Sequence, residues 1–226
     1  MYTLAISFSG LALIALIFVR RNSSFSSTAA SIDESQLTVS EALCQRQYWV
    51  LVAMDFCTLF PLLYMASVYK IMGMQIGNYD DNFLTIVSSI GAIANGLSRV
   101  VWGYVQDMTG FRTIYKIVLV TELFFCTLVP YVVKLNGPLY LIMIFLGNMC
   151  LGAHFVIFPN CIVSIFGLRS SVQLSSLIYV ARCVPAFSGM FISKALVNAY
   201  GEATYSIMFY TSSILVIISF LLLYFI

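Results

Sequence analysis

NGLSRVVWGYVQDMTGFR, the stretch from Asn95 to Arg112, decides the fold of this chain. It begins inside an apolar run that carries Arg99, and it ends in a polar turn. Glycine and charged residues in and before this turn follow a fixed spacing: Gly103, Asp107, Gly110 and Arg112. An arginine inside a membrane span costs about 2.5 to 3.5 kcal/mol to insert, so it needs a partner inside the protein. Arg99 is therefore the first candidate for a functional site.

The composition is that of a membrane protein. Apolar residues make up 61% of the 226 residues and charged residues only 9%, whereas about a quarter of a soluble chain is charged. The net charge of +2 and the lack of a basic run longer than Arg20-Arg21 exclude nucleic acid as a partner. The six cysteines show no C-x-x-C spacing. No nucleophile, metal or phosphate-loop pattern is present, so we predict no enzyme, no metal and no cofactor.

Seven stretches are apolar over the roughly 20 residues that a transmembrane helix needs. They are residues 1–19, 48–69, 83–105, 115–134, 138–160, 172–195 and 204–226. The first lacks the basic n-region of a signal peptide and is followed by its positive charges, so we interpret it as a span. The sequence thus predicts an all-α, multi-pass integral membrane protein in the lipid bilayer. Its parts are a lone helix (1–19), a cytoplasmic linker (20–47) and a six-helix unit (48–226).

Lysine and arginine predict the orientation, because they accumulate in cytoplasmic loops. With the N-terminus outside and the C-terminus cytoplasmic, six basic residues lie inside and three outside. The inside set is Arg20, Arg21, Arg46, Arg112, Lys116 and Arg169, and the outside set is Lys70, Lys134 and Lys194.

The linker is rich in serine and threonine up to about residue 36. Residues 36–46 are expected to form a short surface helix with Thr38 or Ser40 as its cap. A regulatory phosphorylation loop is the alternative interpretation of this segment.

The polar turn G-x-x-x-D-x-x-G-x-R resembles the cytoplasmic loop signature of the major facilitator superfamily, although Met108 stands at its usual basic position. The resemblance implies two six-helix halves related by an axis along the membrane normal, with substrate held between them. One span, a long linker and six compactly joined spans look like the last helix of an N-terminal half followed by a complete C-terminal half. Such a half-bundle lacks five helices. It needs the missing N-terminal half, a second subunit or a homodimer.

Three further motifs resemble the oxalate:formate antiporter and monocarboxylate transporter branch of that superfamily. On the third span, Asn95, Arg99 and Gly103 reproduce the spacing of a polar residue, an arginine and a glycine. The fifth span matches at Phe158, Pro159, Phe166 and Gly167, and the sixth at Arg182. The resemblance implies that the two basic side chains hold the carboxylates of the substrate. The proton-coupled members carry an aspartate where Asn95 stands, and an amide takes up no proton near neutral pH. Exchange or facilitated diffusion is therefore expected.

The depth of each arginine along its helix indicates which of the two is the stronger candidate for a substrate ligand. At 1.5 Å per residue, Arg99 shares its depth with Asp55 and Glu122, whereas Arg182 lies near the midplane, where we expect no carboxylate. Arg182 is thus the stronger substrate ligand, with a structural arginine as the alternative. Arg99 is either a ligand or part of an internal ion pair.

The remaining candidates surround these arginines. Asn95, Arg99, Trp102 and Gln106 share one helical face, which suits a water-filled cavity. We expect that cavity to be lined by five residues: Asn95, Arg99, His154, Tyr179 and Arg182. His154 is a proton relay or a packing histidine, and Tyr179 orients a carboxylate or packs at an interface. Pro159 and Pro185 are candidate bending points. The turn with Gly103, Asp107, Gly110 and Arg112 is expected to act as a conformational latch.

The predicted function is transmembrane transport of small organic anions, either mono- or dicarboxylates, by alternating access. We expect the protein to be located in the plasma membrane or in the inner membrane of an organelle. The alternative is a structural subunit of a membrane complex, derived from a transporter half, that does not transport. A rhodopsin-like receptor is excluded because its D-R-Y and N-P-x-x-Y motifs are absent.

Overall fold

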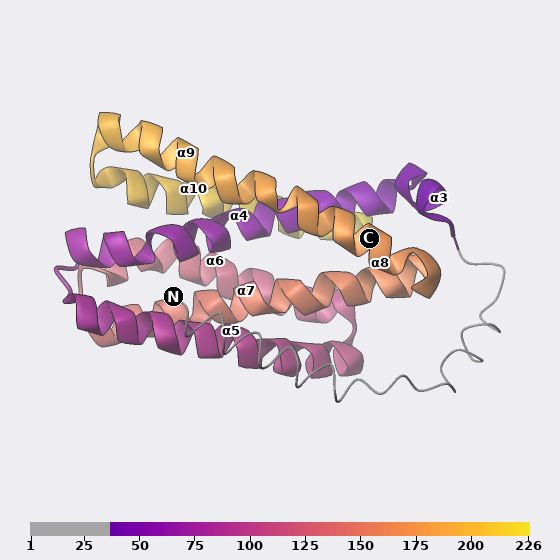
Figure 1. Ribbon diagram of the computed structural model, residues 1–226, viewed down its shortest axis with the longest axis horizontal. Coiled ribbons are helices and arrows are strands. Elements are labelled where there is room, and N and C mark those ends of the chain that lie inside the picture. The colour runs from indigo at the N-terminus through magenta and orange to yellow at the C-terminus, as the bar shows by residue number, and fades with distance from the viewer. Residues whose placement is uncertain (1–36) are drawn as a thin grey trace, which may run out of the picture. The chain divides into compact units, whose positions relative to one another are not determined.

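The computed structural model describes residues 37–226, and the predicted first span, 1–19, lies outside this range. Six segments of the described range are helices long and apolar enough to cross a membrane. They lie side by side along the long axis in Figure 1, and the described residues contain no strand. This confirms the all-α membrane fold and the last six predicted spans. The division into a lone helix, a linker and a six-helix unit stays a prediction.

The helices extend beyond the apolar cores that predicted them. Their bounds are α3 Val39–Cys44, α4 Arg46–Gln75, α5 Asp81–Thr109, α6 Phe111–Val132, α7 Gly137–Phe166, α8 Leu168–Ala181, α9 Cys183–Tyr200 and α10 Ala203–Leu222, followed by the 3₁₀ turn η1 Leu223–Phe225. Side-chain caps explain several of the starts. Asp80 accepts a hydrogen bond from the backbone of Asn82 before α5, and Asn136 does the same for Leu139 before α7.

α3 confirms the short helix predicted before the second span. Thr38 is its N-cap, and Glu41 reaches back to the backbone N–H of Thr38 at 2.7 Å. This reciprocal capping box satisfies donors that the first helical turn leaves free.

The sixth predicted span bends where the sequence places a proline. α8 ends at Ala181 and α9 begins at Cys183, with Arg182 between them. Pro185 has no N–H to donate to the carbonyl of Ala181, so the helical ladder is interrupted at that point. Pro159, the other predicted bending point, lies inside the continuous helix α7. Arg182 therefore lies at the break itself, and its side chain extends from that point.

The helices pack as two related triplets. α5 packs against α7 and α9 packs against α4, while α6 contacts α7 and α10 contacts α4. Exchanging α4, α5 and α6 with α7, α8–α9 and α10 therefore preserves the contact pattern, as a three-plus-three unit requires. α4 and α7 are the most buried spans, and α5 and α8–α9 are the least buried. The cavity described below lies between these two exposed spans.

A glycine lets α5 and α7 approach closely. A Cβ atom added to Gly152 of α7 would overlap Ser98 Oγ and approach the carbonyl oxygen of Asn95 on α5. Small residues at such crossings allow the backbones of membrane helices to come into contact.

Candidate functional site

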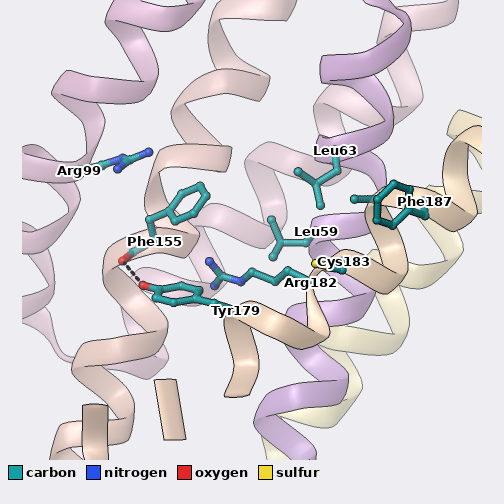
Figure 2. A pocket seen from close by; sticks show the side chains of 9 residues that line it. Leu59, Leu63, Arg99, Phe155, Tyr179, Arg182, Cys183 and Phe187 are labelled. Atoms are coloured by element: carbon teal, nitrogen blue, oxygen red, sulfur yellow. Dashed lines mark hydrogen bonds between the residues drawn. The ribbon is translucent and has the colours of Figure 1, made fainter. Parts of the chain in front are cut away.

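An open cavity of about 510 Å³ lies among α4, α5, α7, α8 and α9. Its lining is apolar and aromatic apart from two arginines; the residues are Leu59, Leu63, Arg99, Phe155, Tyr179, Arg182, Cys183, Ala186 and Phe187. Figure 2 shows Arg99 and Arg182 extending from opposite sides of this cavity, with the ring of Phe155 between them. The two arginines predicted to share a site therefore face one cavity. Concave apolar pockets with a few convergent polar groups are the usual form of a small-molecule site.

Of the two arginines at the cavity, Arg99 is the one without a counter-ion in the part of the chain that the structure describes. It lies ten residues before the end of α5, which corresponds to about 15 Å from that end along the helix axis. Arg99 Nη2 donates to Asn95 Oδ1 at 3.1 Å, and the guanidinium lies 4.5 Å from the centre of the Phe155 ring. Among residues 37–226, no carboxylate forms an ion pair with it. The internal ion pair with Asp55 or Glu122, the alternative interpretation of Arg99, is therefore wrong.

Arg182 is instead the paired arginine, which corrects the prediction from depth. Arg182 Nε donates to Asp55 Oδ2 at 2.8 Å and Nη2 donates to Asp55 Oδ1 at 2.9 Å, a bidentate charge-assisted pair. Nη2 also donates to the carbonyl of His154 at 3.0 Å. The relative exposure of the side chains is 8% for Arg182 and 3% for Asp55. The expectation that no carboxylate shares the depth of Arg182 failed because α8 and α9 break at this residue and its long side chain reaches α4.

Phe155 and Tyr179 hold the two guanidinium groups in place. The guanidinium of Arg182 lies 4.5 Å from the ring centre of Tyr179 and 5.0 Å from that of Phe155. The Tyr179 hydroxyl donates to the carbonyl of Phe155 at 3.3 Å. Phe155 thus contacts both arginines through cation–π interactions. Phe155 is not predictable from the sequence, because an aromatic residue next to a histidine in an apolar span carries no signal of its own.

His154 and Asn95, both expected to line the cavity, lie elsewhere. His154 is 1% exposed. Its ring nitrogens lie 2.8 Å from the carbonyl of Cys150 and 2.8 Å from the hydroxyl of Thr58. This geometry is that of the packing histidine. Asn95 is half-buried beside the cavity and acts on it through its hydrogen bond to Arg99.

The polar face predicted on α5 meets a helix rather than water. Trp102 Nε1 donates to the carbonyl of Met149 at 3.1 Å, and Gln106 Nε2 donates to the carbonyl of Ile157 at 3.1 Å. Both acceptors belong to α7. Of this face, only Arg99 reaches the cavity, so the stripe mainly fixes the contact between α5 and α7.

The turn of the Gly103 to Arg112 motif joins α5 to α6. Gly110 ends α5 and starts α6 with φ +80° and ψ 164°, a conformation that is open almost only to glycine. Asp107 and Arg112 are exposed, and neither forms an ion pair within residues 37–226. Gly103 packs near Val156 of α7. The latch role of this turn stays a prediction.

No group of three or more histidine, cysteine or acidic residues in the described range is placed to hold a metal ion. The six cysteines are free thiols.

Three transporters have sequences similar to this chain. A pyruvate carrier named apicoplast pyruvate carrier 1, from Toxoplasma gondii, is 21% identical over 175 residues, which is 75% of this chain and 32% of the carrier. The oxalate:formate antiporter of Oxalobacter formigenes is 24% identical over 76% of this chain and 41% of the antiporter. The uncharacterized MFS-type transporter YhjX of Escherichia coli strain K12 is 26% identical over 68% of this chain and 38% of YhjX.

The chain is similar to one half of a major facilitator transporter. This similarity agrees with the six spans, their paired triplets and the cavity between α5 and α8–α9. The chain spans about a third to two fifths of the length of the transporters it matches. No protein family profile matches the sequence.

Proposed function

We propose that the chain is the C-terminal half of a larger or split transporter that moves small organic anions, mono- or dicarboxylates, by alternating access. The observation that carries this proposal is the pair of arginines, Arg99 and Arg182, on one apolar cavity. A guanidinium stays charged at any accessible pH. Two such groups in a low-dielectric cavity favour anions, and the planar fork of each suits a carboxylate.

We propose Arg99 as the primary ligand for a substrate carboxylate, which the pairing of Arg182 with Asp55 supports. Its guanidinium is exposed to the cavity and is held by one amide and one aromatic ring. Arg182 lines the same cavity from the other side. The names of the matched transporters include pyruvate, oxalate and formate as substrates, which supports this substrate class. Asn95 is an amide and takes up no proton near neutral pH. Considered alone, this residue of α5 therefore favours exchange or facilitated diffusion over proton coupling.

A second half is part of the proposal, because α5 and α8–α9 leave one side of the cavity open and are the least buried spans. The missing N-terminal half, a second subunit or a homodimer would cover it. We propose the orientation given by the basic residues, with the C-terminus in the cytoplasm. Uptake of a carboxylate into liposomes by the monomeric chain alone would contradict the need for a second half.

Ligand binding tests the proposed site. The chain in lipid nanodiscs is titrated with pyruvate and oxalate, and neutral methyl pyruvate serves as the control ligand. Arg99→Gln is expected to weaken carboxylate binding by about 10- to 150-fold, since a hydrogen bond to a charged group contributes about 1.5–3 kcal/mol. Arg182→Lys keeps part of the binding, whereas Arg182→Gln loses more. Arg112→Gln, in the turn outside the cavity, is the matched control.

The results separate the proposal from its alternative. Equal binding of methyl pyruvate and pyruvate, or full binding by Arg99→Gln, would contradict the carboxylate site. A folded chain that binds neither acid would instead support the structural subunit that does not transport.

A further inference from the structure

The Asp55–Arg182 pair separates two cavities. Arg182 lines the 510 Å³ cavity of the proposed substrate site, and it also lines a second cavity of about 210 Å³ between α4 and the α8–α9 break. Asp55 lines only the second cavity, whose other residues are apolar. A carboxylate with a cavity of its own can exchange a proton without passing through the space in which the substrate binds.

The hydrogen bonds of Arg182 leave one part of its guanidinium unused. Nε and Nη2 are occupied by Asp55 and by the carbonyl of His154. Nη1 is buried and has no hydrogen-bond partner among residues 37–226. Because the donor without a partner is buried, an incoming carboxylate has to take over the donors that now bond to Asp55, and it meets a cation whose charge Asp55 already balances.

We propose that the carboxylate of the substrate and that of Asp55 compete for Arg182, so that substrate binds together with one proton on Asp55. This inference rests on the proposed function and adds the proton as the ion that is coupled to transport. The proton comes from water and binds a carboxylate oxygen of Asp55, while Arg182 keeps its charge and transfers its hydrogen bonds to the substrate. α4 thereby supplies the acid that Asn95 does not supply on α5. A proton symport replaces the exchange or facilitated diffusion expected from α5 alone.

Of the titratable groups near Asp55, Arg182 lines both cavities, whereas Arg99, Tyr179 and Cys183 line only the first. α6 contributes Tyr115 and Glu122, both of which interact electrostatically with Asp55. The Tyr115 hydroxyl is bonded to Ser219 at 2.8 Å, and Glu122 is fully buried, with no partner for either oxygen in the described range.

Three further elements that pack against α4, namely α7, α10 and α3, offer no rival to Asp55. His154 of α7 uses both ring nitrogens in the core. α10 carries no charged side chain between Ala203 and Leu222, and the acid of α3, Glu41, forms the capping box at the surface. Asp55 is thus the acid of this cluster that borders a cavity.

Proton uptake by the unmodified chain is the direct test. Pyruvate is added to the chain in weakly buffered nanodiscs, and a pH-indicator dye reports the protons taken up per bound ligand. Above the pH at which Asp55 titrates in the free chain, we expect about one proton per pyruvate and a tenfold weaker Kd for each unit of pH increase. Pyruvate binding without proton uptake and with a Kd independent of pH would overturn the inference and leave the carboxylate site intact. Absence of any binding would overturn both.

Two variants assign the proton to a residue. Asp55→Asn is expected to bind pyruvate with a Kd that is independent of pH and without proton uptake, whereas Glu122→Gln, the matched control, keeps both properties. Loss of proton uptake in Glu122→Gln, or its persistence in Asp55→Asn, would overturn the assignment. Should Asp55→Asn fail to fold, the proton count of the unmodified chain and of Glu122→Gln decides the question.

Discussion

Replacing Asp55 with asparagine removes the counter-ion of Arg182, whose side chain is 8% exposed, and disrupts two of the three hydrogen bonds of its guanidinium. Breaking a buried ion pair from one side costs about 3–5 kcal/mol, because the remaining charge is left without compensation. At about 2–4 °C per kcal/mol for a chain of this size, the melting temperature falls by roughly 6 to 20 °C. The cation–π contacts of Arg182 with Phe155 and Tyr179 remain, so we expect a folded but much less stable chain.

A double-mutant cycle isolates the pair. Arg182→Gln alone leaves the Asp55 carboxyl buried without its main partner, while Asp55→Asn with Arg182→Gln leaves two neutral amides. The double variant is expected to be less destabilised than the sum of the single variants, by up to about 3 kcal/mol. Thermal unfolding in detergent, followed by the fluorescence of the tryptophans, measures each term. Asp107→Asn, an exposed acid without an ion pair in the described residues, is the control and should change stability by less than about 0.5 kcal/mol. Additive single effects would refute the pairing.

The remaining predictions concern the helix contacts and turns. Gly152→Ala forces a Cβ into atoms of α5 and should cost about 1–3 kcal/mol in thermal unfolding, whereas Gly96→Ala, with open space around its Cβ, should be neutral or stabilising. Gly110→Ala should cost about 1–3 kcal/mol from backbone conformation alone, since nothing lies within 4 Å of its Cβ. The backbone and side-chain hydrogen bonds of Thr38 lower the pKa of Glu41 below its usual 4.5. Because the folded-state pKa is the lower one, this stabilisation of α3 is present above pH 4.5 and is lost as the pH falls through the lowered value. Amide exchange of α3 as a function of pH should show the loss, and Thr38→Ala should weaken the pH dependence, because it removes the side-chain hydrogen bond to Glu41 and keeps the backbone one.

Local signals in the sequence were sufficient for the helices. The apolar runs predicted the six spans of the described range, Thr38 predicted the start of α3, and Pro185 predicted the break after α8. Each of these features depends on residues within one or two helical turns of each other, so counting along the sequence captures them.

The site depends on rotation, tilt and side-chain reach, which counting does not capture. Adjacent residues on a helix point about 100° apart, and the sequence gives no reason to turn the apolar Phe155 toward the cavity rather than the polar His154. The reason lies in the core, where His154 finds the Cys150 carbonyl and the Thr58 hydroxyl. The pairing of Asp55 with Arg182 escaped prediction for a similar reason. Counting residues along a span gives the depth of a Cα atom in a straight helix. The segment α8–α9 is broken, however, and an arginine side chain extends several ångströms beyond its backbone.

The charge of the cavity follows from which arginine is paired. With Asp55 ionised, the Asp55–Arg182 pair is neutral and Arg99 alone contributes one positive charge. Under the proposed competition, pyruvate and one proton on Asp55 bind together and add no net charge, so the cavity keeps one positive charge. A dicarboxylate such as oxalate that binds with one proton would add one negative charge and leave the site neutral. Because a guanidinium does not titrate in this range, Asp55 and not the arginines would set how the binding of either anion depends on pH.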